Sequence, residues 1–239
     1  MADARERLII ALDVSSADAA LRMVRALGES SISYKVGMQL YTAEGPDIVR
    51  DLVAEGRQVF LDLKYHDIPN TVGAAVREAA KLGVSMLTVH SSGGAKMLKA
   101  AADAAREINP KLRVLAVSVL TSFKDENLVE VGSRGPLTEQ VLRLSGLALE
   151  AGCQGVVASA REAPALRAAL GKEFTLVTPG VRPVGVGHDD QARVVTPAEA
   201  IAAGASHIVV GRPITEAADP ALAARTILDQ MAGNASSQA

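Results

Sequence analysis

The sequence has no tryptophan, and Phe, Tyr and Trp together make up only 3% of its 239 residues. A core without large rings has to be built from Ala, Val, Leu and Ile, which suits tightly packed parallel strands and the helices that cover them. The chain also has a single cysteine, Cys153, so an intramolecular disulfide is excluded. The apolar neighbours of Cys153 favour a small buried side chain over a nucleophile.

The sequence has neither a basic tract nor a large net charge, since 25 Lys and Arg oppose 27 Asp and Glu for a formal charge of −2. This balance predicts neither a nucleic-acid-binding nor a membrane-binding surface. No apolar stretch reaches transmembrane length, and the first residues lack a signal-peptide pattern. We expect a cytoplasmic protein with one domain over residues 1–232 and a frayed tail at 233–239.

Eight short apolar runs rich in β-branched residues alternate with longer Ala-rich amphipathic stretches. Such runs are typical of strands buried on both faces. Several of the intervening stretches end in glycine at the expected helix stop. We expect strands at 8–14, 34–38, 58–64, 86–90, 113–121, 155–159, 175–180 and 207–212, and helix stops at Gly28, Gly56, Gly83, Gly152 and Gly204.

Eight βα units in a chain of this length predict a single-domain (β/α)8 barrel, the TIM-barrel fold. The alternative is an open doubly wound sheet. That fold is disfavoured because the turn after the first run is Asp-Val-Ser-Ser at 13–16, without the Gly-x-Gly-x-x-Gly of dinucleotide-binding sheets.

Charged residues stand at the ends of apolar runs where a buried core is expected. Asp13 ends the first run, Lys35 lies in the second, and Asp62 and Lys64 end the third, with Asp67 three residues later. Buried charge is unfavourable unless it is paired, and barrel enzymes build their sites at the carboxyl ends of their strands. For any one residue a structural salt bridge is the simpler interpretation, but four on adjacent strand ends predict an active site.

A second group follows the last two runs. Arg182 follows the seventh, and Gly211 and Arg212 end the eighth, where barrels commonly bind phosphate. Backbone N–H groups at Gly211 and Arg212, with a guanidinium group, would suit an anion. The glycine-rich stretch 184–191 between them, which includes Gln191, has the composition of a lid that closes on substrate.

The remaining polar candidates each have an ordinary alternative. His90 either lines the site or is a satisfied core histidine, and His66 could orient a neighbour. Thr121 ends the fifth run and either contacts a polar ring or caps the strand. His188 and His207 have no evident partner. No metal motif with convincing spacing is present.

Taken together, these residues resemble the orotidine 5'-phosphate decarboxylase family of the bacterial type. The match extends from Leu8 through Arg212. Its most specific part is the decapeptide Asp62-Leu-Lys-Tyr-His-Asp-Ile-Pro-Asn-Thr71, supported by Leu120-Thr-Ser122, Pro179-Gly-Val-Arg182 and Val210-Gly-Arg212 in the expected order.

The resemblance implies cofactor-independent decarboxylation of orotidine 5'-monophosphate to UMP, the last step of de novo pyrimidine synthesis. In this family Lys64 would protonate C6 of the pyrimidine, and Asp62 would lie beside the departing carboxylate. Asp67 and Thr71 would reach into the site of a second subunit, which makes the enzyme a homodimer.

The remaining roles implied by the resemblance concern substrate binding. Asp13 and Lys35 would hold the ribose hydroxyls and complete the charge network. The set of substrate-binding residues implied by the family further comprises Ile68, Thr121 on the pyrimidine, and Arg182, Gln191, Gly211 and Arg212 on the phosphate, with Gln191 on the lid.

Two alternatives remain open at this point. One is a metal-dependent sugar-phosphate decarboxylase or aldolase of the same barrel superfamily, which also carries an Asp-x-Lys-x-x-Asp run but has an acidic residue in place of Lys35. A lysine at that position would repel the metal ion. The other is a non-catalytic phosphate-binding barrel, which would be expected to have lost Lys64 or one of the aspartates.

Overall fold

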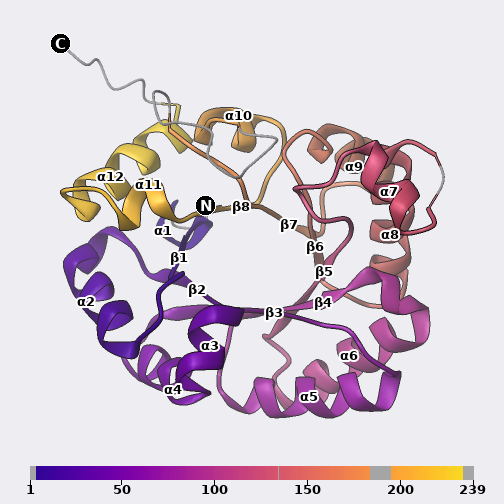
Figure 1. Cartoon of the computed structure of the whole chain (residues 1–239), viewed down its shortest axis with the longest axis horizontal. Coiled ribbons are helices and arrows are strands. Elements are labelled where there is room, and N and C mark those ends of the chain that lie inside the picture. The colour runs from indigo at the N-terminus through magenta and orange to yellow at the C-terminus, as the bar shows by residue number, and fades with distance from the viewer. Residues whose placement is uncertain (1–3, 134, 184–194, 234–239) are drawn as a thin grey trace.

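The fold is a closed barrel of eight parallel strands, each followed along the chain by helices that cover its outside (Figure 1). The computed structural model describes residues 4–133, 135–183 and 195–233. Strands pair in chain order, and β8 closes the barrel against β1. They are β1 Leu8–Ala11, β2 Ser33–Gly37, β3 Gln58–Tyr65, β4 Met86–His90, β5 Arg113–Val117, β6 Gly155–Val157, β7 Thr175–Thr178 and β8 His207–Val210.

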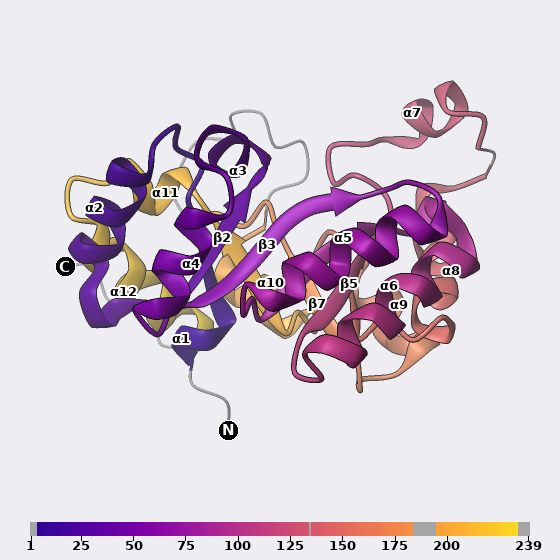
Figure 2. The ribbon, with the colours of Figure 1, turned by 90° about the horizontal axis from the view of Figure 1, so that it is seen from below.

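The helices form an outer ring around the strands, and the predicted TIM-barrel fold is therefore confirmed. One of them, α7, stands away from the ring between β5 and α8 (Figure 2). The helices are α1 Ala4–Arg7, α2 Ala17–Leu27, α3 Met38–Glu44, α4 Asp47–Ala54, α5 Pro69–Lys81, α6 Gly94–Ile108, α7 Asp125–Glu130, α8 Leu137–Glu150, α9 Ala163–Leu170, α10 Pro197–Ala202, α11 Arg212–Thr215 and α12 Pro220–Met231, with short 3-10 turns η1 Gly28–Ser30 and η2 Ser91–Gly93.

Alternation along the strands separates two hydrophobic clusters. Strand positions two apart face the same side of the sheet. The barrel interior is filled by one small cluster, and the layer between strands and helices by a much larger one that includes Leu61, Leu87 and Val89. The interior cluster consists of Ile9, Ala11, Phe60, Met86, Leu115, Val117, Val157, Val177 and Val209.

Several strands end earlier than their apolar runs. The run at 113–121 was expected to be one strand, but β5 ends at Val117 and Thr121 lies in the following turn. The expected strand end at Thr121 is wrong because pairing with the short strand β6 ceases at Val157. Asp13 and Arg212 likewise follow their strands rather than end them. The five predicted helix-stop glycines all have positive φ, as glycine at that position permits.

The pairing of β3 with β4 contains a bulge. Leu61 pairs with Leu87, and the next pair is Tyr65 with Val89. The three β3 residues from Asp62 to Lys64 therefore lie opposite a single β4 residue, Thr88. A bulge of this kind redirects side chains and is common beside active sites. Within the described part of the chain, no helix combines the length and the apolar character needed to cross a membrane.

Candidate active site

Four charged side chains from three neighbouring strands meet at one end of the barrel. Oδ2 of Asp62 lies 2.9 Å from Nζ of Lys64 and 3.9 Å from Nζ of Lys35. Nζ of Lys35 also donates to Oδ1 of Asp13 at 2.9 Å. The structure thus brings together the four residues that the sequence placed on three adjacent strands, and their charges alternate from Asp13 to Lys64.

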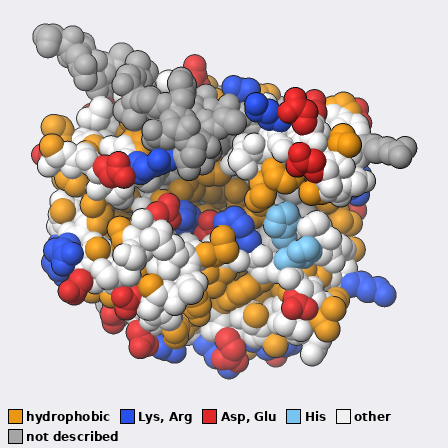
Figure 3. Space-filling model, viewed as in Figure 1, with side chains coloured by type: hydrophobic (Ala, Val, Ile, Leu, Met, Phe, Trp, Pro, Cys, Tyr) orange, Lys and Arg blue, Asp and Glu red, His pale blue; other side chains and the backbone are white. Residues whose placement is uncertain are grey.

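The network is buried at its centre and open at its ends. The side chains of Lys35 and Asp62 are each 13% exposed, whereas that of Lys64 is 28% and that of Asp13 58% exposed. Charges withdrawn from water to this degree have to compensate one another, and the two lysines and two aspartates do so. Figure 3 shows the hollow at the centre of this face, with acidic and basic side chains gathered at it.

The backbone at Lys64 adopts a left-handed conformation, with φ of 53°. A non-glycine residue in this region carries strain of roughly 1–3 kcal/mol and needs support from its surroundings. That support comes from β4, because the N–H of Lys64 donates to Oγ1 of Thr88 at 2.9 Å. The same hydroxyl donates to Oδ1 of Asp62 at 2.9 Å.

A cavity of about 170 Å³ lies over Lys64. Its polar lining comes from Lys35, Asp62, Lys64 and Thr121. The rest of the wall is apolar, from Phe60, Val117, Val119, Leu120, Val157, Pro179 and Val209. Such a space suits a flat, largely apolar ring that presents one charged group to the lysine.

A second cavity of about 530 Å³ adjoins the first, since Lys35, Pro179 and Val209 line both. Its lining also includes Arg182 and Arg212 together with Gly180 and Gly211, none of which lines the first cavity. Arg182 is only 5% exposed, and its backbone N–H donates to the carbonyl of Val195 at 3.0 Å. The combined space therefore has Lys64 in its first part and the two arginines in its second.

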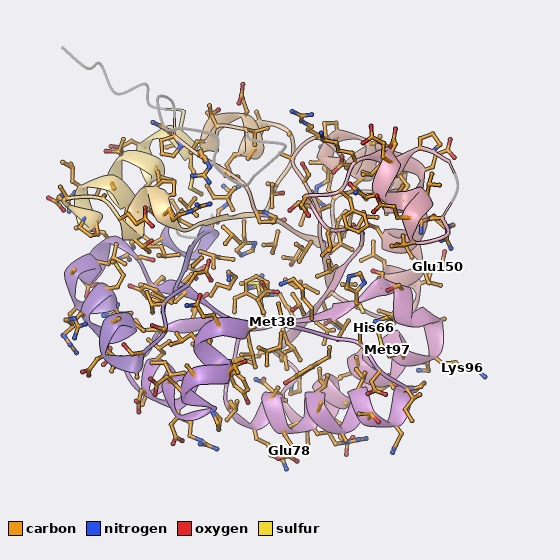
Figure 4. The ribbon with its side chains drawn as sticks, viewed as in Figure 1. Met38, His66, Glu78, Lys96, Met97 and Glu150 are labelled. Atoms are coloured by element: carbon orange, nitrogen blue, oxygen red, sulfur yellow. The ribbon has the colours of Figure 1, made fainter. Side chains whose placement is uncertain are left out.

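The two histidines beside the charged run contact each other. The rings of His66 and His90 lie 5.5 Å apart between centroids, and Oγ of Ser92 lies 2.9 Å from Nδ1 of His90. Burial lowers the pKa of His90, and the nearby His66 and Lys64 lower it further. Each of these effects favours the neutral form of His90. In Figure 4 His66 lies beside Met97 of α6, and both approach Gly93 closely.

The loop after β3 faces outward. Asp67, Ile68 and Thr71 are exposed, with Ile68 at 66%. Oδ1 of Asp67 accepts from the N–H of Ile68 at 2.6 Å, and no ion pair joins Asp67 to Lys64 in the part of the chain that the structure describes. None of these three residues lines either of the two cavities.

Two further expectations concern the lid and metal binding. Gln191 and the stretch 184–191 lie outside the described residues. Among the residues that are described, no group of three or more His, Cys, Asp and Glu side chains is arranged to hold a metal ion.

Sequence reasoning missed two residues of this site. Thr88 lies two residues before His90 on β4, so strand alternation points both side chains into the barrel. A polar residue at an inward position was the available signal. Gly37 was also missed: a Cβ there would lie 2.9 Å from Nζ of Lys35 and 3.4 Å from Oδ1 of Asp13. Nothing in the local sequence separates it from an ordinary turn glycine.

Residues 6–227 match the family model described as orotidine 5'-phosphate decarboxylase / HUMPS family. Orotidine 5'-phosphate decarboxylase of Heliobacterium modesticaldum is 50% identical over 236 residues, which cover 96% of this chain and 97% of that protein. The protein of the same name from Moorella thermoacetica is 51% identical over 230 residues, which cover 94% and 91%. The crystal structure of orotidine 5'-phosphate decarboxylase from Lactobacillus acidophilus matches with a TM-score of 0.86 at 39% identity and covers 95% of this chain and 99% of that one.

Proposed function

Because the chain belongs to the orotidine 5'-phosphate decarboxylase / HUMPS family, we propose that it is an orotidine 5'-phosphate decarboxylase. It is a carboxy-lyase that converts orotidine 5'-monophosphate to UMP and CO2, the last step of de novo pyrimidine synthesis. The observation that carries the proposal is the pair of adjoining cavities, one lined by Lys64 and the other by Arg182 and Arg212.

The substrate fits this space by its chemistry. Orotidine 5'-monophosphate has a carboxylate on a flat ring at one end, a phosphate at the other and a ribose diol between them. The ring lies in the apolar cavity with its carboxylate toward Lys64. The diol faces Asp13 and Lys35, which line the second cavity. The phosphate binds Arg182, Arg212 and the backbone at Gly211.

The chemical step takes place at C6. The bond from C6 to the carboxylate carbon breaks, CO2 leaves, and the electron pair stays on C6. The ammonium group of Lys64 stabilises that charge as it develops and then gives C6 a proton, which the lysine regains from solvent. Asp62, at 2.9 Å from Nζ of Lys64, holds the ammonium group beside the reacting carbon.

Phosphate binding contributes to catalysis although the phosphate is remote from C6. Binding energy gained there lowers the barrier when it closes the site and excludes water. We place Gln191 in this closure, on the lid between phosphate and ring, and Thr121 against the pyrimidine in the first cavity.

The enzyme acts as a homodimer in which Asp67 and Thr71 complete the site of the other subunit, with Ile68 beside the substrate. The exposure of this loop, with an apolar side chain at Ile68, supports that arrangement.

The metal-dependent sugar-phosphate decarboxylase or aldolase is the weaker candidate. Its metal ion would need carboxylates free to coordinate it. Here the ammonium group of Lys35 lies between Asp13 and Asp62, where it would repel a divalent cation.

The test measures the rate of decarboxylation of orotidine 5'-monophosphate from the change in ultraviolet absorbance, with and without EDTA. We expect turnover that EDTA does not alter and a loss of at least about 100-fold in Lys64→Ala. Lys99→Ala is the matched control, because Lys99 is an exposed lysine of α6 paired with Asp103. Absence of turnover in the unmodified enzyme would overturn the function, and equal turnover in Lys64→Ala would overturn the role of Lys64.

A further inference from the structure

One hydroxyl group on β4 serves two residues of β3. Because of the bulge, Asp62 and Lys64 both lie opposite Thr88. Its Oγ1 donates to Oδ1 of Asp62 and accepts from the N–H of Lys64, each at 2.9 Å. Thr88 itself is fully buried, so water does not compete for these hydrogen bonds.

We propose that Thr88 is a positioning residue for catalysis, acting through Asp62 and Lys64 without touching the substrate. The proposal rests on the proposed function. Binding of Oδ1 by Thr88 fixes the rotation of the Asp62 carboxylate, which leaves Oδ2 aimed at Nζ of Lys64. The same hydroxyl also accepts a hydrogen bond from the N–H of Lys64, which holds the backbone of Lys64 in its left-handed conformation.

The left-handed backbone determines where the lysine side chain starts. In an ordinary extended conformation the Cα–Cβ bond of Lys64 would leave the strand in another direction, and Nζ would not meet Oδ2 of Asp62 in the same way. The strain of that conformation has to be offset locally. The hydrogen bond from Lys64 to Thr88 is placed to do this, since it engages the N–H of the strained residue itself.

A purely structural role and a positioning role differ in what they change. If Thr88 only satisfies buried polar groups, its loss lowers stability and leaves turnover per folded site unchanged. If it aims the catalytic pair, its loss lowers kcat and leaves ground-state binding nearly intact, because the arginines and the ring cavity are untouched.

The experiment compares Thr88→Val, which keeps the shape and removes the hydroxyl, with Thr88→Ser, which keeps the hydroxyl. Both are measured for kcat and KM with orotidine 5'-monophosphate, for UMP affinity, and for Tm. We expect kcat to fall at least tenfold in Thr88→Val, with KM and UMP affinity within about threefold of the unmodified enzyme. Thr88→Ser should retain kcat within about threefold.

The matched control is Thr178→Val. Thr178 is likewise a fully buried strand threonine, on β7, and its hydroxyl has no hydrogen-bond partner among the described residues. It lines neither cavity. Its replacement tests the effect of losing a buried hydroxyl as such, and we expect no change in kcat.

Three results would overturn the proposal while the unmodified enzyme remains active: a kcat for Thr88→Val within threefold of normal, a Thr88→Ser variant as slow as Thr88→Val, or an equal loss in Thr178→Val. If Thr88→Val fails to fold, Thr88→Ala replaces it, and kcat per UMP-binding site must still be at least tenfold below that of Thr88→Ser. An unmodified enzyme without turnover would instead contradict the proposed function.

Discussion

Gly37 leaves the space that the ammonium group of Lys35 occupies: a Cβ on residue 37 would lie 2.9 Å from Nζ of Lys35. Gly37 ends β2 with φ of −95°, which any residue can adopt. A side chain at position 37 would therefore require the Lys35 ammonium group to move, whereas the backbone conformation itself does not require glycine. Gly37, at the end of β2, therefore lies against the ion pair between Lys35 and Asp13.

Gly37→Ala should displace the Lys35 ammonium group from Asp13 and weaken the network. We expect kcat/KM for orotidine 5'-monophosphate to fall at least about tenfold, ~1.4 kcal/mol, with little change in Tm. Gly146→Ala is the control, because a Cβ on this α8 residue meets only ordinary contact at 3.7 Å from Leu170. Alanine there should leave activity unchanged and raise stability by roughly 0.5–1 kcal/mol. Normal activity in Gly37→Ala would show that Lys35 finds another productive position.

Arg212→Ala should lower kcat/KM for orotidine 5'-monophosphate by at least about tenfold, because a charge-assisted hydrogen bond to phosphate contributes roughly 1.5–3 kcal/mol. The same variant should match the unmodified enzyme on orotidine, which lacks the phosphate. Arg225→Ala, in α12 and bonded to Ser30, is the control for loss of an exposed arginine. A loss below about threefold, ~0.6 kcal/mol, would remove Arg212 from the phosphate site.

Mixing two inactive variants tests the contribution of Asp67 across the dimer. Lys64→Ala and Asp67→Ala subunits, unfolded together and refolded, should form mixed dimers with one intact site, if Asp67 serves the partner. Random pairing then restores about a quarter of normal activity. If Asp67 instead acts within its own subunit, every site in the mixture lacks one group and activity stays at the level of the separate variants.

His207, buried at the start of β8, should make stability depend on pH. Burial, followed by the positive charges of Arg113 and Arg7, lowers the pKa of His207 to about 4. An unfolded histidine has a pKa of about 6.5. Between pH 6.5 and 4, His207 is protonated in the unfolded chain but stays largely neutral in the folded chain. The free energy of unfolding therefore falls as the pH falls from 6.5 to 4, by about 3 kcal/mol in all.

This dependence can be isolated with His207→Gln. Urea unfolding at fixed protein concentration and a series of pH values should give a shallower decline for the variant between pH 6.5 and 4. The difference between the two curves removes the contribution of carboxylates that titrate in the same range. Parallel curves would mean that His207 takes up its proton at the same pH in the folded and the unfolded chain.

The order and number of the strands could be predicted because each strand is an apolar run with its own local signal. The ends of the strands could not. The run at 113–121 is apolar beyond Val117, yet β5 stops there because its neighbour β6 ends at Val157. A strand ends where its pairing ends, and pairing depends on residues about 40 positions away in the sequence.

The site residues that could be predicted are those that are unusual in an apolar strand. Asp62 and Lys64 are conspicuous there because buried charge is rare without a partner. Thr88 is not, since threonine is common in strands. Gly37 was not predicted either, because its importance comes from the room it leaves for the Lys35 side chain and not from its own backbone conformation.

The sequence by itself determined which residues face the barrel interior, because alternation along a strand is a local property of the backbone. That is enough to send Asp62 and Thr88 inward, whereas the direction of the Lys64 side chain also depends on the bulge and its left-handed backbone. Only the tertiary structure decided that they meet. Pairing of β1 with β2 and of β2 with β3 places the three strands side by side, so that Asp13 reaches Lys35. The bulge between β3 and β4 puts one threonine, Thr88, opposite both Asp62 and Lys64. Register and bulges arise from pairing between distant segments, and no local pattern encodes them.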